Sequence, residues 1–175
     1  MNSSPSSVSG FTLIELLLVV VIAGILTMIA IPGFKSLSQS QRVKNASFEL
    51  YSALSLARSE AIKRNNDVIF TPVTYAAVAS PSPAHNEWGW TITATAGGVT
   101  TTIRKQAQLK DIALTPDISI TGGITFRRTG RAAISPIILV DAYGSTSPFP
   151  FARCIKIELS GMPRIYKPVN GACLP

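Results

Sequence analysis

Residues 10–31 read GFTLIELLLVVVIAGILTMIAI, and this run decides the fold. Seventeen of the 21 residues from Phe11 to Ile31 are apolar, which is close to the length of about 20 residues that a membrane-crossing helix needs. Glu15 is the one charged residue in the run, and a carboxylate in such a helix normally requires a partner. The run therefore predicts an apolar helix over 11–31. It is either a plain membrane anchor with a stray acid or a helix that uses Glu15.

The remainder of the chain has the composition of one small domain. The chain has 175 residues, of which 46% are hydrophobic, and its mean hydropathy is +0.32. This length argues against a multi-domain enzyme, and the composition excludes a disordered or collagen-like chain. Sixteen Lys and Arg against nine Asp and Glu give a net charge of +7. Nucleic acid, lipid head groups and acidic polysaccharide are therefore all candidate partners.

A second helical segment follows the apolar run. Pro32 and Gly33 predict that the helix bends or locally melts near residues 28–33. Beyond them, small and apolar residues recur at spacings of three and four: Val43, Ala46, Leu50, Leu54, Ala57 and Ala61. This stripe predicts an amphipathic helix over 32–66 that lies on a sheet and ends at Asn65–Asp67. Together the two segments predict one nearly continuous helix from Thr12 to Arg64.

Short strands are predicted after this helix, because residues 67–175 are rich in Thr, Ile and Val with Gly and Pro between them. The Pro72-containing segment 68–75 is expected near a sheet edge, and 76–87 is expected to be a loop. A two-residue turn at Gly97–Gly98 predicts a hairpin that sets Ile92 opposite Ile103. Gly122–Gly123 fits a bulge or longer loop instead. Further strands are expected around 124–126, 131–140 and 155–159.

Catalytic chemistry finds little support in the sequence. His85 is the only histidine and lies in a Pro- and Ser-rich segment, so the chain lacks a second histidine ligand for zinc and an evident His-centred triad. It also lacks the nucleophile-elbow, P-loop and dinucleotide-binding glycine motifs. We therefore expect no enzyme activity, no cofactor and no metal site.

Two groups of basic residues are candidate anion or DNA-binding sites. In the first, a two-residue turn at Thr129–Gly130 would place Arg128 across from Arg131, where like charges repel. The group is either a solvated turn or an anion site. Few aromatic residues lie near the second group, so any nucleic-acid binding should be dominated by phosphate contacts and depend strongly on salt. The candidates are Arg127, Arg128 and Arg131 in the first group, and Arg153, Lys156, Arg164 and Lys167 in the second.

The N-terminal residues resemble a known signature. The run Gly10-Phe11-Thr12-Leu13-Ile14-Glu15, followed by mostly apolar residues, is similar to the prepilin signature of type IV pilins and type II secretion pseudopilins. The resemblance implies that residues 1–10 are a leader, cut between Gly10 and Phe11 by a prepilin peptidase, and that Phe11 is then N-methylated. It also implies a role for Glu15, whose carboxylate would pair with the Phe11 amino group of a neighbouring subunit in a filament.

Later residues resemble the GspH/FimT group of minor pilins and pseudopilins. The matching pieces, in order, are Ala57–Ala61, Trp88–Trp90, Ile124–Phe126 with Gly130-Arg131, and Cys154 with a C-terminal Cys173. This resemblance implies an α+β, type IV pilin-like fold. A long N-terminal helix, transmembrane in its first half, would pack on a C-terminal antiparallel β-sheet domain that is closed by a Cys154–Cys173 disulfide.

The resemblance implies a minor pilin that supports type IV pilus assembly or priming, twitching and adhesion. Two alternatives stay open: a DNA receptor in natural transformation, and a minor pseudopilin of a type II secretion system. In the DNA-binding branch a G-R-x-R motif follows the last strand; here Gly161 and Arg164 match it, but Met162 replaces the first arginine, which favours the structural role. The implied partners are other major and minor pilins, the peptidase, the inner membrane before assembly and, in the DNA alternative, DNA. The domain would lie in the periplasm and later in the pilus.

Overall fold

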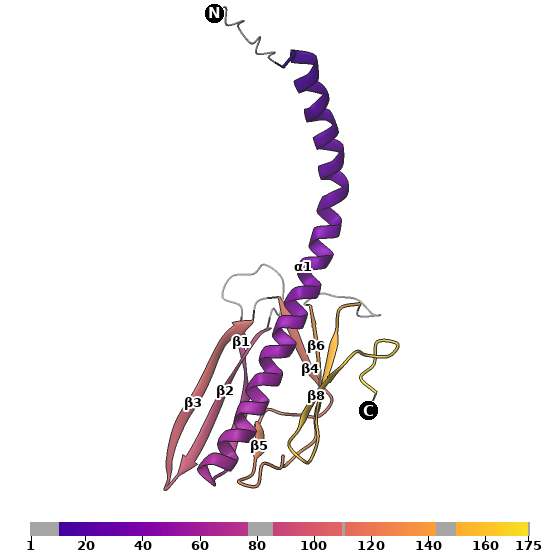
Figure 1. The fold of residues 1–175 in the computed structure, drawn as a ribbon. Helices are drawn as coiled ribbons and strands as arrows, with labels where there is room; N and C mark the ends of the chain where they lie inside the picture. The colour runs from indigo at the N-terminus through magenta and orange to yellow at the C-terminus, as the bar shows by residue number, and fades with distance from the viewer. Residues whose placement is uncertain (1–10, 77–85, 110, 143–149, 175) are drawn as a thin grey trace, which may run out of the picture. The chain divides into compact units, whose positions relative to one another are not determined.

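A long helix followed by antiparallel strands forms the fold. The computed structural model describes residues 11–76, 86–109, 111–142 and 150–174, and the chain divides into two compact units, Met1–Ser38 and Gln39–Pro175. The helix, α1 (Leu13–Arg64), has 52 residues and belongs to both units (Figure 1). This element order confirms the predicted α+β class.

The ends of α1 follow from local sequence. The Thr12 hydroxyl accepts a hydrogen bond from the N–H of Glu15 at 3.3 Å, as an N-cap does. At the other end Asn65 has φ 49°, the left-handed conformation that commonly ends helices. The helix continues through Pro32 and Gly33, so of the two predicted alternatives, a bend or local melting, the melting is wrong. A proline removes one backbone bond, and the many remaining bonds of a long helix keep it formed.

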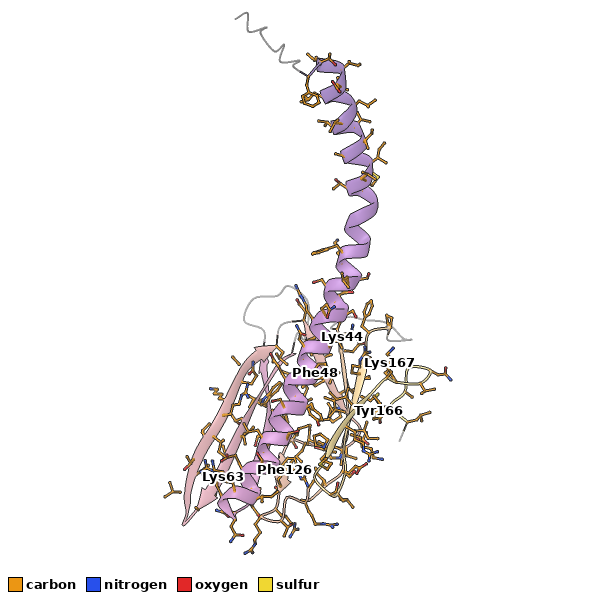
Figure 2. All side chains as sticks on the ribbon, in the orientation of Figure 1. Lys44, Phe48, Lys63, Phe126, Tyr166 and Lys167 are labelled. Atoms are coloured by element: carbon orange, nitrogen blue, oxygen red, sulfur yellow. A yellow bond between two sulfur atoms is a disulfide. The ribbon has the colours of Figure 1, made fainter. Side chains whose placement is uncertain are left out.

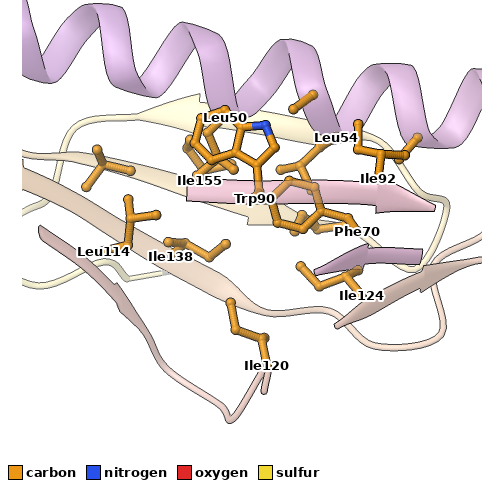
Figure 3. Close-up of a cluster of buried hydrophobic side chains, with 14 of the residues drawn as sticks. Leu50, Leu54, Phe70, Trp90, Ile92, Leu114, Ile120, Ile124, Ile138 and Ile155 are labelled. Carbon is orange, nitrogen blue, oxygen red and sulfur yellow. The ribbon is translucent and has the colours of Figure 1, made fainter. Parts of the chain in front are cut away.

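The second half of α1 buries the predicted stripe. All six of its residues are at most 3% exposed, which confirms the amphipathic pattern. In Figure 3, Leu50 and Leu54 of α1 lie beside Trp90, Phe70 and Ile155 of the strands. The Phe70 and Trp90 rings lie 6.0 Å apart, within the usual range for aromatic pairs. One hydrophobic core thus joins the helix to the strands within residues 39–175.

The first sheet has the strand order β3-β2-β1-β5, formed by β1 (Val68–Ala76), β2 (Asn86–Ala96), β3 (Val99–Leu109) and β5 (Ile124–Phe126). β1 is next to the short edge strand β5, in agreement with the place near a sheet edge that Pro72 suggested. β5 pairs only with Val68–Phe70, so Pro72 lies past the end of that pairing, where a missing N–H is tolerated. The expected loop 76–87 is too long at both ends, because Ala76 and Asn86 belong to strands. Its central residues, 77–85, lie outside the described residues.

The β2–β3 hairpin confirms one prediction and corrects another. Gly97 and Gly98 form the two-residue turn, with φ values of 58° and 80°. Ile92, however, pairs with Arg104 and not with Ile103, because the register shifts between Ile92 and Thr93. Such a bulge adds one residue to one strand and moves the following pairs by one position.

The second sheet has the order β4-β6-β7-β8, formed by β4 (Ile112–Pro116), β6 (Ile137–Ala142), β7 (Arg153–Ile157) and β8 (Pro163–Tyr166). The strand predicted at 131–140 begins only at Ile137. The strand predicted at 155–159 ends at Ile157, because a turn follows in which Gly161 donates to the Glu158 carbonyl at 2.7 Å. Leu159 is consequently 52% exposed. Gly123 lies in a loop that connects β4 of this sheet to β5 of the first, in agreement with the longer loop expected there.

Candidate functional site

The first half of α1 presents an apolar surface. Each large hydrophobic side chain described between Phe11 and Met28 is 49% to 86% exposed within the single chain. Soluble monomers rarely expose apolar patches of this extent, so this surface requires a partner. Phe11, the predicted methylation site, is the most exposed of them at 86%, whereas Gly10 lies outside the described residues. No helix in the described part of the chain is long and apolar enough to cross a membrane, so the span predicted for 11–31 is not confirmed.

Glu15 is exposed in the first turn of this apolar helix. Thr12 and Glu15 stand in the spacing of a capping box, in which the threonine caps the helix and the acid at the third helical position faces back toward it. The Thr12 half of this arrangement is present as the 3.3 Å bond to the Glu15 N–H. The sequence carried this T-x-x-E signal, and it gives Glu15 a local role beside the predicted intersubunit one.

The C-terminal segment is tied to the second sheet by a disulfide. Cys154 of β7 is bonded to Cys173, with their Cα atoms 5.6 Å apart, which confirms the predicted pair. A tight turn at Asn170–Gly171 lies within the closed loop, where Val169 and Ala172 pair. In the chain-entropy model, closing a loop of this length stabilises the fold by about 3 kcal/mol. The residues after β8 are thereby held near β7.

The first basic group lies in a three-residue turn after β5. The N–H of Arg127 donates to the Arg131 carbonyl at 2.8 Å, and the N–H of Gly130 donates to the Arg127 carbonyl at 2.7 Å. Arg131 therefore lies opposite Arg127, not opposite Arg128 as predicted, because the turn contains three residues and Gly130 takes φ 77° in it. All three arginines are exposed. Two like charges therefore still lie opposite each other in this turn, but they belong to Arg127 and Arg131.

This turn packs against a second turn, at Glu158–Met162. Arg58 of α1 connects the two, because its Nε donates to the Gly130 carbonyl at 3.2 Å and its Nη1 lies 2.7 Å from the sulfur of Met162. The turns also meet directly at Gly130 and Gly161, where a Cβ on Gly161 would lie 1.9 Å from the Gly130 oxygen. Sequence reasoning did not connect these two turns.

The second basic group is partly engaged within the fold. Arg164 forms an ion pair with Glu158 at 3.0 Å, and Arg153 donates to the backbone oxygens of residues 151 and 152. Lys156 lies directly opposite Arg164 in the β7–β8 pairing, and Lys167 is exposed just after β8 (Figure 2). The Glu158–Met162 turn connects β7 to β8. Its contact with the 127–131 turn therefore brings the first basic group close to the strands that carry the second basic group.

The end of α1 contributes little free positive charge to this region. Glu60 accepts a hydrogen bond from Arg64 at 2.6 Å and lies 3.6 Å from the Lys63 ammonium. The Arg64 hydrogen bond, helped by the charges of both neighbours, lowers the pKa of Glu60, so this carboxylate is ionised at neutral pH. Lys63 and Arg64 are therefore partly neutralised, and the exposed arginines of the 127–131 turn are the stronger anion-binding candidates.

Among the described residues, no three His, Cys, Asp or Glu side chains are grouped so that they could hold a metal ion. His85 lies outside that part of the chain.

Two buried polar atoms in the described residues have no hydrogen-bond partner, Trp90 Nε1 and the Tyr166 hydroxyl. Burial, and then the nearby Asp117 carboxylate, raise the pKa of Tyr166, so its hydroxyl remains neutral at physiological pH.

Comparisons with known proteins agree with this fold. Residues 46–161 match the family model described as type II transport protein GspH, and residues 5–31 match the prokaryotic N-terminal methylation motif. No curated protein matches the chain. The crystal structure of the type IV minor pilin FimU of Pseudomonas aeruginosa is similar with a TM-score of 0.53 and 18% identity, over 73% of this chain and 90% of that one. The minor pseudopilin EpsH from the type 2 secretion system of Vibrio cholerae is similar with a TM-score of 0.50 and 15% identity, over 71% and 96% of the two chains.

Proposed function

The chain belongs to the GspH family of minor pilins and pseudopilins, and from this premise we propose that it is a minor pilin of a type IV pilus. The exposed apolar half of α1 carries this proposal. A helix that presents apolar side chains all around is unstable in water and becomes stable in lipid or among similar helices. A filament subunit meets both environments in turn, first as a precursor in the inner membrane with its domain in the periplasm and then in the filament.

The processing steps follow the same logic. We propose that the prepilin peptidase cuts between Gly10 and Phe11 and that the new Phe11 amino group is methylated. Removal of the polar leader places a positive charge directly before the apolar helix. In the filament, this charge would pair with Glu15 of a neighbouring subunit, so that neither charge is left unpaired among apolar side chains.

Filament incorporation is tested by recovering the protein from sheared pili. An epitope tag placed after residue 174 should be found by immunogold labelling in a small fraction of the filaments. Deletion of the gene should lower the number of pili and twitching motility, and expression of the tagged chain should restore both. Normal piliation in the deletion strain, with no tag in purified filaments, would contradict the proposal. If secretion of exoproteins fails while piliation is normal, the chain is a pseudopilin.

A second candidate function is DNA binding, and the exposed arginines of the 127–131 turn favour it. Arg127, Arg128 and Arg131 are exposed, and in the described residues no ion pair engages their side chains. Arg164 lies near the adjoining turn, although Glu158 neutralises part of its charge. Such a surface would bind the phosphates of duplex DNA without reading its sequence.

Changing Arg127, Arg128 and Arg131 to glutamine together should nearly abolish DNA binding. Three lost phosphate contacts would reduce the slope of log K against log salt by about 3. The full chain in non-ionic detergent is titrated with duplex DNA at several salt concentrations in a mobility-shift assay. The control changes Arg104 and Lys105 of β3, which are also exposed, to glutamine and so removes two positive charges against three. If this control weakens binding by as much per removed charge as the triple variant does, net charge and not the turn is responsible.

A further inference from the structure

The second sheet carries a cavity beside its edge strand β8. Its volume is about 390 Å³, within the range of small-ligand sites. Strand β7 and the turn after it provide Lys156 and Glu158, and β8 provides Arg164, Ile165 and Tyr166. Leu174, from the segment that follows the disulfide, forms part of the wall. The cavity lies wholly within residues 39–175.

Two cations face each other across the β7–β8 pair at this cavity. Lys156 and Arg164 are direct partners in the antiparallel register, so their side chains leave the same face of the sheet at neighbouring positions. Like charges directly opposite destabilise a strand pair. An anion bound between them would convert this repulsion into attraction, and the cavity in front of them provides the room.

With Lys156, Arg164 and the carboxylate of Glu158, the site carries a net charge of one positive unit. Glu158 pairs with Arg164 at 3.0 Å. For Lys156, by contrast, the described residues provide neither an ion pair nor a hydrogen bond to the ammonium group. Two cations and one carboxylate fit a monoanion better than a phosphate dianion. They fit the repeated phosphates of a nucleic acid less well than the exposed arginine turn does.

The rest of the wall is largely apolar. Ile165, Tyr166 and Leu174 line the cavity beside the charged groups. Leu174 is 58% exposed in the chain and is held close to β7 by the neighbouring disulfide, so it can cover a ligand. A fully hydrated inorganic anion would gain nothing from these contacts, whereas an aliphatic group would.

We propose that this cavity binds a carboxylate carried on an apolar group, with Lys156 as its principal charge partner. The carboxylate is either that of a small organic acid or an acidic side chain next to an apolar residue in a partner protein. Binding does not require a filament, so it can succeed or fail independently of the proposed pilin function.

The test is an NMR titration of the full chain in non-ionic detergent micelles. Hexanoate represents a small organic acid, and acetyl-Leu-Asp-amide represents an acidic side chain of a partner protein. The compound that binds more tightly identifies the source of the carboxylate. Saturable shifts of the amide signals of Lys156, Arg164 and Leu174 are expected with at least one of them. Hexanamide, which has the same chain without the charge, should cause none. Absence of saturable shifts with both acids, or equal binding of hexanamide or inorganic phosphate, would overturn the proposal.

Three variants locate the binding. Lys156→Gln should lower the affinity for the acid about tenfold, as expected for a lost charge-assisted hydrogen bond. It should leave the midpoint of thermal unfolding unchanged or raise it, because a like-charge pair is removed. Leu174→Ala should lower the affinity for hexanoate about fivefold but should not change the affinity for acetate, which lacks the apolar chain. Lys167→Gln, an exposed lysine outside the cavity wall, is the control and should change nothing. A lower midpoint for Lys156→Gln with unaltered affinity would assign Lys156 to the fold and not to the ligand.

Discussion

Gly161→Ala is expected to lower the free energy of unfolding of residues 39–175 by about 3 to 5 kcal/mol. Gly161 has φ 81°, which costs an alanine about 1 to 2 kcal/mol by itself. In addition, the new methyl group would lie 1.9 Å from the Gly130 carbonyl oxygen, and real structures do not allow such a contact. Because the obstacle is backbone, the two turns must separate, and the hydrogen bond from Arg58 to Gly130 would be strained as well.

Gly98→Ala is the matched control for this prediction. Gly98 has φ 80°, nearly the same as Gly161, but no atom lies within 4 Å of its Cβ position. Its substitution should therefore cost only the backbone term, about 1 to 2 kcal/mol. Urea unfolding of both variants, followed by circular dichroism on the full chain in detergent, separates the two contributions. Equal losses for the two variants would show that the turn contact contributes nothing.

The sequence predicts those parts of the fold that depend on near neighbours. The stripe from Val43 to Ala61 identifies the buried helix face because its spacing is a local property of the helix. Gly97–Gly98 identifies its hairpin turn for the same reason. The pairing of Ile92 was predicted incorrectly because the bulge that displaces it depends on how β2 fits between β1 and β3, which only the complete sheet determines.

The candidate sites show the same division. The Thr12–Glu15 cap can be recognised from four residues. The charged pair Lys156 and Arg164 cannot, because it requires the register of β7 with β8, and β8 is too short for its pattern to be distinguished from a loop. The contact between Gly130 and Gly161 joins two turns that are distant in the chain. Such contacts follow from packing, and a single sequence carries no local signal for them.

Glu15→Gln is expected to prevent incorporation of the subunit into filaments. If the Glu15 carboxylate pairs with the amino group of a neighbouring Phe11 in an apolar bundle, removing its charge leaves the amine unpaired, which costs about 3 kcal/mol or more. That loss corresponds to on the order of a hundredfold in the assembly equilibrium. Glutamine is the informative replacement because it also fits the capping-box position, so the start of α1 should remain intact. The amount of tagged subunit in sheared filaments and the helix content by circular dichroism are measured together.

The local and the intersubunit roles of Glu15 predict different results for this pair of measurements. If Glu15 only stabilises the first turn of α1, Glu15→Gln should change neither quantity appreciably, because the effect of a charge on a helix end is about 0.3 to 1 kcal/mol. If Glu15 pairs across subunits, helix content stays constant while incorporation is lost. Glu49→Gln, at an exposed acid of the same helix, should leave both unchanged. An incorporated Glu15→Gln subunit would therefore exclude the pairing with Phe11, and loss of incorporation in Glu49→Gln as well would show that the assay reports the net charge of the subunit.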